Sequence, residues 1–423
     1  MSPDRGSGAR TASLESLLAS REVLVFCGSG GVGKTSTAAA AGLAAAVHVG
    51  GRVLVLTIDP AKRLADALGL EGIGNEERRV PDEVLRSAGL NPRGEMWAAM
   101  LDTKASWDNL VLRHAPDEET ARQILDNRLY DNLTSRFVQS HDYIAMERLY
   151  DLHSTGAWDL IVVDTPPTRN ALDFLDAPQR MADFFGGRLL RWLTAPYRLG
   201  GRRGARLVNL ASKPFYQVAD RILGTQFLQD IAEFFLNFET MYQGFVTRAR
   251  AVERLMKDQR TAFAVVTTLE GAPLREAQYF CSELTGRGYH LGALVLNRVL
   301  PESFADPQIA AAADRLVADP DDVAARLVDL GLPGLVDPAA VTRVLRTVGK
   351  SFQDFAVVAT REAELREQLA KAPEVLATVP TFAEDVHDVS GLVRIGECLL
   401  GAPLPSARVR ADARAGEAEH RPG

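Results

Sequence analysis

The chain has 423 residues, of which 46% are hydrophobic, and a formal net charge of −7. This length and apolar content allow one large core or two smaller ones, and they exclude a chain that is disordered throughout. The acidic balance argues against a nucleic-acid-binding protein, because binding to a phosphate backbone needs many lysines and arginines.

Short apolar runs recur along the chain with helical segments between them, a pattern typical of a mostly parallel sheet flanked by helices. The sequence therefore predicts an α/β fold. The predicted strands are residues 23–27, 53–58, 96–101, 160–164, 262–267, 291–296 and 375–380. The chain ends, residues 1–12 and 404–423, contain almost no large apolar side chains and are expected to be disordered.

The strand pattern is interrupted twice. Helical periodicity replaces it in residues 103–155 and 176–259, which we interpret as insertions that pack together as one helical subdomain. Residues 20–102, 156–175 and 260–400 then form the remaining α/β domain.

The first predicted strand leads into a glycine-rich loop and an alanine-rich helix. The loop consists of Gly28, Ser29, Gly30, Gly31, Val32, Gly33, Lys34, Thr35 and Ser36. This G-x4-G-K-T sequence, placed between a strand and a helix, is typical of the phosphate-binding loop of P-loop NTPases. Its glycines let successive N–H groups point at phosphate oxygens, and the helix N-terminus adds a favourable dipole. We expect Lys34 to contact the β- and γ-phosphates of a nucleoside triphosphate and Thr35 to bind Mg²⁺.

Acidic residues follow or end two other predicted strands. Asp59 comes after the second strand and Asp164 ends the fourth. Both should lie at the carboxyl edge of the sheet, where ligands bind in open α/β folds. Asp59 is a candidate to orient and deprotonate the attacking water, and it also fits a helix N-cap followed by Pro60. Asp164 matches a Walker B acid, which holds Mg²⁺ through a coordinated water.

The candidate catalytic residues are therefore Lys34, Asp59 and Asp164, and the predicted Mg²⁺ site combines Thr35 with the same two acids, partly through water. The segment from Thr165 to Ala171 follows directly. It is a candidate switch, because a loop that is bonded to the γ-phosphate and then released converts hydrolysis into motion. Alternatively, its two prolines only stiffen a tight connection.

These motifs resemble the nucleotide site of the ATPase family that includes the arsenite-pump ATPase and the targeting factor for tail-anchored membrane proteins. The resemblance extends from about residue 20 to about residue 400. It implies an ATPase that closes around two nucleotides at a dimer interface, with helical subdomains that form a client-binding surface. It also implies that Asn297 contacts adenine and that Pro380 and Phe382 belong to a loop beside the base.

The chain departs from this family at Ser29, where the family usually has a Lys that reaches the partner's phosphates. A cation supplied in trans can contribute roughly 10³-fold or more to phosphoryl transfer. Three explanations stay open. A related subunit supplies the charge in a heterodimer, a nearby side chain such as Arg169 replaces it, or hydrolysis is slow.

The chain also lacks the family's metal-binding cysteines. Cys27, Cys281 and Cys398 are isolated in the sequence, without a Cys-x-x-Cys pair. We therefore predict neither a zinc clasp nor an arsenite site. A reducing cytosol is the expected location, with peripheral attachment to a membrane as a further option.

Two segments are candidates for client contacts. Residues 227–245 place an aromatic stripe on one helical face, for which core packing is favoured over an open groove for an apolar helix. The stripe consists of Phe227, Leu228, Ile231, Phe234, Phe235, Phe238, Met241, Tyr242 and Phe245. Residues 198–206 are rich in arginine and form either a solvated loop or a contact with an anionic membrane or a membrane-protein client.

Three functions are compatible with these features. The favoured one is a Mg²⁺-dependent ATPase whose nucleotide state switches a homodimer or heterodimer and a client-binding surface. The second is a weakly hydrolysing partner subunit of a heterodimeric ATPase, which the Ser29 departure suggests. The third is a surface-positioning ATPase of the partitioning type, against which the long helical insertions argue.

Overall fold

The computed structural model describes residues 13–58, 63–70, 72–127, 129–131, 134, 138–166, 175–177, 179–180, 183, 225–331, 336–369 and 374–402. Its centre is an eight-stranded sheet with the order β3-β4-β2-β5-β1-β6-β7-β8. The strands are β1 (Val23–Cys27), β2 (Arg52–Thr57), β3 (Arg78–Arg79), β4 (Glu95–Met100), β5 (Leu160–Asp164), β6 (Thr261–Thr267), β7 (Leu291–Val299) and β8 (Val375–Pro380). All pairings are parallel except that of β3 with β4. The α/β fold class is confirmed, and β3 is a strand that the sequence did not predict.

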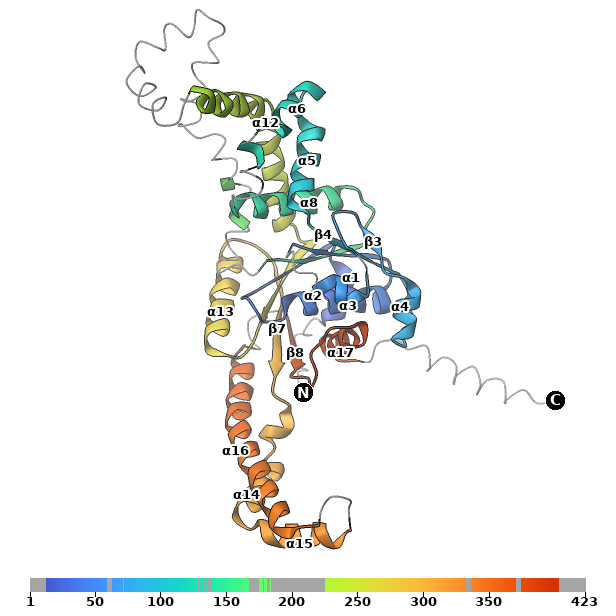
Figure 1. The fold of residues 1–423 in the computed structure, drawn as a ribbon, viewed down its shortest axis with the longest axis vertical. Coiled ribbons are helices and arrows are strands. Elements are labelled where there is room, and N and C mark those ends of the chain that lie inside the picture. Colours follow the sequence, from blue (N-terminus) through green and yellow to red (C-terminus); the bar gives the residue numbers. More distant parts are fainter. Residues whose placement is uncertain are drawn as a thin grey trace, which may run out of the picture.

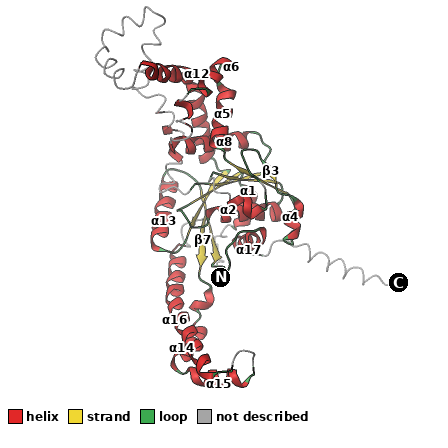
Figure 2. Cartoon of the chain, viewed as in Figure 1, coloured by secondary structure: helices red, strands yellow, loops and turns green. Residues whose placement is uncertain are grey.

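Helices cover both faces of the sheet (Figures 1 and 2). One face carries α1 (Leu14–Ser20), α2 (Lys34–Ala44), α3 (Arg63–Leu68), α4 (Asp82–Ser87) and α17 (Val389–Leu400). The other carries α5 (Thr103–His114), α6 (Glu118–Leu125), α8 (Val138–Ser154), α12 (Thr225–Lys257) and α13 (Gly271–Gly286). A five-residue π-helical turn, Ala45–Val49, continues α2.

Burial on both faces explains why the strands read as continuous apolar runs rather than as alternating patterns. In β1, Val23, Val25 and Cys27 pack into the core on the α12 side. Leu24 and Phe26 pack into the core on the α2 side. All five side chains are buried, so β1 sits at the centre of the molecule and holds the loop that follows it in place.

Helices α5, α6, α8 and α12 form a helical unit at one end of the molecule (Figure 1). Its centre is aromatic: the ring of Trp107 lies 5.7 Å from that of Tyr143 and 6.3 Å from that of Phe245. Phe234 and Met241 on α12 are also buried. Core packing therefore accounts for these members of the aromatic stripe. The side chains at 227, 228, 231, 238 and 242, and the basic segment 198–206, lie outside the described residues.

A buried ion pair joins α8 to α12 inside this helical unit. Arg248 Nε donates to both carboxylate oxygens of Glu147, each at 3.0 Å, and the hydroxyl of Tyr143 also donates to Glu147. Burial raises the pKa of Glu147, and the adjacent guanidinium of Arg248 opposes that rise. Since removing one partner of a buried pair typically costs about 3–5 kcal/mol, this contact ties the two helices together.

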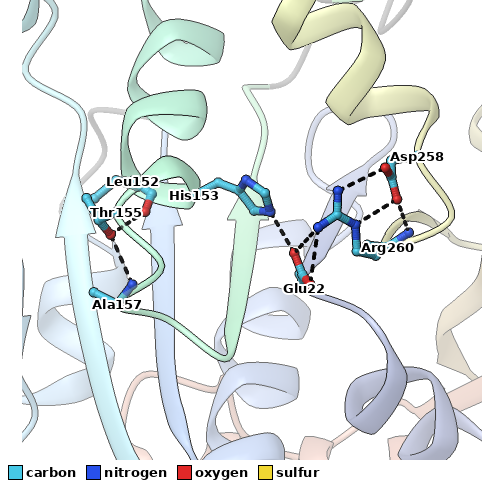
Figure 3. Close-up of polar contacts among 7 residues, drawn as sticks. All are labelled: Glu22, Leu152, His153, Thr155, Ala157, Asp258 and Arg260. Carbon is cyan, nitrogen blue, oxygen red and sulfur yellow. Dashed lines mark hydrogen bonds and ion pairs between the residues drawn. The ribbon is translucent and has the colours of Figure 1, made fainter.

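A polar network at the amino edge of the sheet fastens the same helices to the strands. Figure 3 shows Glu22 between His153, near the end of α8, and Arg260, which precedes β6. Glu22 lies 2.8 Å from His153 Nε2 and 3.3 Å from Arg260, and Arg260 Nε donates to Asp258 at 3.0 Å. The hydrogen bonds from Arg260 lower the pKa of Asp258 to about 2.

A helical arm, residues 302–369, projects from the opposite end of the molecule (Figure 1). It contains the 3₁₀ turn Glu302–Ala305, α14 (Pro307–Ala318), α15 (Pro320–Asp329) and α16 (Pro338–Leu369). Phe304 packs on the rings of Phe352 and Phe355, at 5.2 Å and 5.3 Å, and Gly349 lies against α14. The sequence pattern predicts residues 260–400 as one stretch of the α/β domain and does not distinguish this arm from it.

Most of the exposed large apolar side chains among the described residues lie on this arm. They are Ile309, Leu330, Val336, Val344, Val348, Phe355, Val357 and Val358. The spacing of Val344, Val348, Phe355 and Val358 places these four on one face of α16. The described residues contain no helix long and apolar enough to cross a membrane.

We expect His114, at the end of α5, to make stability depend on pH. Burial, and then the charges of Arg248 and Arg113, lower its pKa to about 4. In the unfolded chain the imidazole gains its proton at about pH 6.5, so stability is fully present above that pH and is lost as the pH falls towards about 4. Denaturant unfolding of His114→Gln between about pH 4 and about pH 7 should show a flatter pH dependence than the wild type. The exposed His387→Gln should keep the wild-type dependence, and equal slopes for all three proteins would contradict this assignment.

Candidate nucleotide-binding site

The predicted phosphate-binding loop connects the carboxyl end of β1 to the first turn of α2. Gly28 and Gly33 have φ angles of 148° and 91°, which side chains rarely tolerate. A Cβ atom at Gly28 would overlap the carbonyl of Val266, and one at Gly33 would overlap the side-chain nitrogen of Asn297. The loop shape therefore requires glycine at both positions, and Gly33 in its left-handed conformation caps α2.

Lys34 is buried at the start of α2, and its Nζ donates to the carbonyl of Ser29 at 2.8 Å. The ammonium therefore lies against the backbone of its own loop. Thr35 and Ser36 follow in the first turn of α2, where N–H groups lack partners within the helix. This arrangement offers an anion both a positive charge and several directed N–H donors.

Asp164 is buried at the carboxyl end of β5, next to β1 in the sheet. Its Oδ2 accepts a hydrogen bond from the hydroxyl of Thr57 at 3.0 Å, and Thr57 ends the neighbouring strand β2. Thr165 follows and donates its hydroxyl to the carbonyl of Phe26 at 2.9 Å. The carboxylate is thus held in a fixed orientation beside the loop-bearing strand.

A cavity of about 520 Å³ adjoins the loop. It is lined by predicted site residues together with residues that the sequence analysis did not single out. The predicted ones are Gly31, Gly33, Thr35, Ser36, Asn297, Pro380 and Phe382; the others include Asp66, Arg298 and His387. The guanidinium of Arg394 lies 4.3 Å from the centre of the Phe382 ring. This volume falls within the range of small-molecule sites.

Asn297 reaches the loop from β7. Its Nδ2 donates to the carbonyl of Val32 at 2.7 Å, and its Oδ1 accepts from the backbone N–H of Arg298 at 3.0 Å. Arg298 has a φ of 58°, the one positive value among the described non-glycine residues. The pairing of β7 with β8 shifts register at the same point, which turns Asn297 towards the loop and Arg298 towards the cavity.

Ser29 is the loop position at which the resemblance described above implies that a Lys is usual. Its hydroxyl donates to Glu276 Oε2 on α13 at 2.7 Å. Glu276 is exposed, so an acidic group stands beside the loop at the point where the cation would be expected. The contact between Ser29 and Glu276 was not predicted from the sequence, because it spans 247 residues.

Several predicted elements lie outside the described residues. These are Asp59, Arg169 and the switch segment beyond Pro166. Neither the role of Asp59 nor the replacement of the missing cation by Arg169 is therefore tested by the geometry. Thr57 was not assigned a role, although its position two residues before Asp59, near the end of a predicted strand, was a signal for one.

The oxygen atoms of Thr35 and Asp164 fit a Mg²⁺ ion, which prefers hard oxygen ligands and few protein contacts. No cluster of three or more His, Cys, Asp or Glu side chains that could hold a metal is present in the parts of the chain that the structure covers. That finding is compatible with a Mg²⁺ ion held mainly by phosphate oxygens and water.

Cys27 is buried directly before the loop, and its burial raises the thiol pKa, which disfavours reactive chemistry there.

A second cavity, of about 790 Å³, lies at the amino edge of the sheet. Its lining includes Glu22, His153, Asp258 and Arg260, the groups that pair with one another in Figure 3. Because these charged groups already pair with one another, they are less available to bind a ligand than the groups beside the phosphate-binding loop. Ligands also bind at the carboxyl edge in open α/β sheets, which is the opposite edge.

The chain is similar to known ATPases. A family model described as anion-transporting ATPase matches residues 21–317. "ATPase BagA" of Mycobacterium tuberculosis is 23% identical over 400 residues, which cover 93% of this chain and 96% of that protein. "Putative arsenical pump-driving ATPase" of Prosthecochloris vibrioformis is 24% identical over 278 residues, which cover 66% of this chain and 61% of that protein. The chain therefore spans 61% of the length of that relative and of its counterpart in Chlorobaculum tepidum.

We expect Thr57→Val to destabilise the protein, because it removes the hydroxyl that donates to Asp164 and keeps the side-chain shape. The loss in the free energy of unfolding should be about 1.5–3 kcal/mol, as for hydrogen bonds to charged groups. Denaturant unfolding measures it. Thr57→Ser, which keeps the hydroxyl, serves as the matched control and should lose less; a valine variant as stable as the wild type would show that the contact is not stabilising.

Proposed function

The chain belongs to the anion-transporting ATPase family, and from this premise we propose that it binds ATP with Mg²⁺ at the described loop and hydrolyses the terminal phosphoanhydride bond. The observation that supports this most strongly is the placement of Lys34 and Asp164. Asp164 ends β5 and is held by Thr57, and the glycine-rich loop that leads to Lys34 follows the adjacent strand β1. The cavity beside the loop has room for the rest of a nucleotide.

In this proposal the loop N–H groups and Lys34 bind the phosphate oxygens and neutralise negative charge as the bond to the γ-phosphate breaks. Thr35 and Asp164 would hold Mg²⁺, which supplies further charge neutralisation when bound. Asp59 orients the attacking water and accepts its proton. Phe382 and Pro380 border the adenine, and Asn297 contacts it.

The nucleotide state is proposed to switch a dimer, as the family resemblance implies. The serine at position 29 supports a partner that supplies the missing cation. Ser29 cannot supply it, because its hydroxyl carries no charge and is hydrogen-bonded to Glu276 within the chain. The competing function is a subunit that binds ATP and hydrolyses it weakly on its own. Measuring phosphate release by the lone chain, and then with a related subunit added, distinguishes the two.

The test of the central proposal is calorimetric binding of Mg-ATP together with phosphate release. Lys34→Ala should weaken ATP binding by about 10- to 100-fold, the equivalent of one hydrogen bond to a charged group. Asp164→Asn should lower Mg²⁺-dependent turnover with a smaller effect on affinity. Lys350→Ala, an exposed lysine on the arm, is the control and should behave as the wild type. Wild-type protein that is folded and takes up no Mg-ATP would refute the function.

Restoring the missing cation tests the dimer model. Ser29→Lys should raise the turnover of the lone chain, by up to about 10³-fold if the cation is limiting. Because Glu276 would attract the new ammonium within the same chain, the double variant Ser29→Lys/Glu276→Gln should show the larger rise. Turnover that stays at the wild-type level in both variants, with Glu276→Gln alone as control, would show that the absent lysine does not limit hydrolysis.

We further propose that an apolar helical client, such as a membrane-protein segment, binds the exposed face of α16. The stripe on α12 is less suited to this role, because Phe234, Met241 and Phe245 are already buried. On α16, by contrast, Val344, Val348 and Phe355 are 47–60% exposed on one helix face. Contiguous exposed apolar surface of this kind often marks an interaction site.

The double variant Val344→Ser/Val348→Ser should weaken binding of a fluorescent apolar helical peptide about tenfold, since it removes buried methyl groups from the contact. Fluorescence anisotropy with ATP or ADP present measures the affinity. Leu112→Ser changes an equally exposed side chain on the helical unit at the other end and should bind as the wild type. The reverse pattern would place the client on that unit instead.

A further inference from the structure

The orientation of the Asn297 amide is fixed by its two partners. The carbonyl of Val32 can only accept a hydrogen bond, so the atom that faces it must be Nδ2. The backbone N–H of Arg298 can only donate, so the other atom must be Oδ1. Asn297 is also buried, with 7% of its surface exposed. Its contact with the loop is therefore specific rather than incidental.

This contact sets the direction of one peptide group in the phosphate-binding loop. In a planar trans peptide the C=O and N–H groups point in opposite directions. When Asn297 holds the carbonyl of Val32 on its own side, the N–H of Gly33 must point away from β7. Only glycine fits at position 33, because a Cβ atom there would overlap the same amide.

The backbone directly after Asn297 has an unfavourable conformation that helps to hold the Asn297 amide in place. Arg298 adopts a left-handed φ of 58°, and the register of β7 with β8 shifts between Asn297 and Val299. Such conformations persist only where their surroundings hold them, and they concentrate at functional sites. Here the strained residue donates its N–H to Oδ1 of Asn297 and so completes the fixation of the amide.

We propose that Asn297 is a positioning residue for the phosphate-binding loop, and that through Val32 it supports triphosphate binding whatever base is attached. The inference rests on the proposed function and extends it. One N–H and one lone pair of the amide remain for a ligand, which suits the donor and acceptor edge of adenine. The same side chain thereby links the base to the loop that binds the phosphates.

The test compares a ligand without a base with one that has a base. Calorimetry of Mg-tripolyphosphate and Mg-ATP is carried out on wild type, Asn297→Ala and the nearly isosteric Asn297→Leu, with Phe382→Ala as the matched cavity control. Both Asn297 variants should lose at least about tenfold in affinity for tripolyphosphate as well as for ATP. Phe382→Ala should lose affinity for ATP alone. Asn297 variants that lose ATP binding and keep wild-type affinity for tripolyphosphate would overturn the inference and confine the residue to base contact.

A second measurement does not depend on nucleotide binding. Amide hydrogen exchange of residues 28–36, measured without added nucleotide, should be faster in Asn297→Ala and Asn297→Leu than in wild type, and unchanged in Phe382→Ala. Equal exchange in all four proteins would overturn the positioning role. If the wild type bound neither ligand, the proposed function would fall, and the exchange comparison would still decide whether Asn297 positions the loop.

Discussion

The nucleotide site depends on one close approach, between the backbone at Gly33 and the side chain of Asn297. There is no room for a Cβ atom at this point, and the positive φ of Gly33 independently demands glycine. The contact joins the loop after β1 to β7, two positions away in the sheet. The start of α2 and one wall of the cavity are therefore held relative to each other by strands of the same sheet.

The sheet can act as this scaffold because both of its faces are buried. Helices pack on each face, and the two edges of the sheet have different roles. At the carboxyl edge, Asp164 ends β5, and the loop that leads to Lys34 follows the neighbouring strand β1. The amino edge carries the network of Glu22, His153 and Arg260, which anchors the helical unit to the sheet.

The features that the sequence predicted are those encoded locally. The strand, loop and helix around Gly28 and Lys34 occupy adjacent residues, so their pattern is visible without a fold. The hydrogen bond from Thr57 to Asp164 spans 107 residues and depends on β2 pairing with β5. The bond from Asn297 to Val32 spans 265 residues, and only the strand order brings them together. The helical arm was missed because its helices resemble those that cross over between strands, and only tertiary packing distinguishes the two.

The short antiparallel strand β3 restricts how two molecules can meet. It contributes just two residues, Arg78 and Arg79, and both are exposed at the border of the sheet. Charged, abbreviated border strands resist the addition of a strand from another chain. A continuous sheet that runs from one molecule into the next is therefore disfavoured on this side, and the molecule is protected there from growing into fibrillar aggregates.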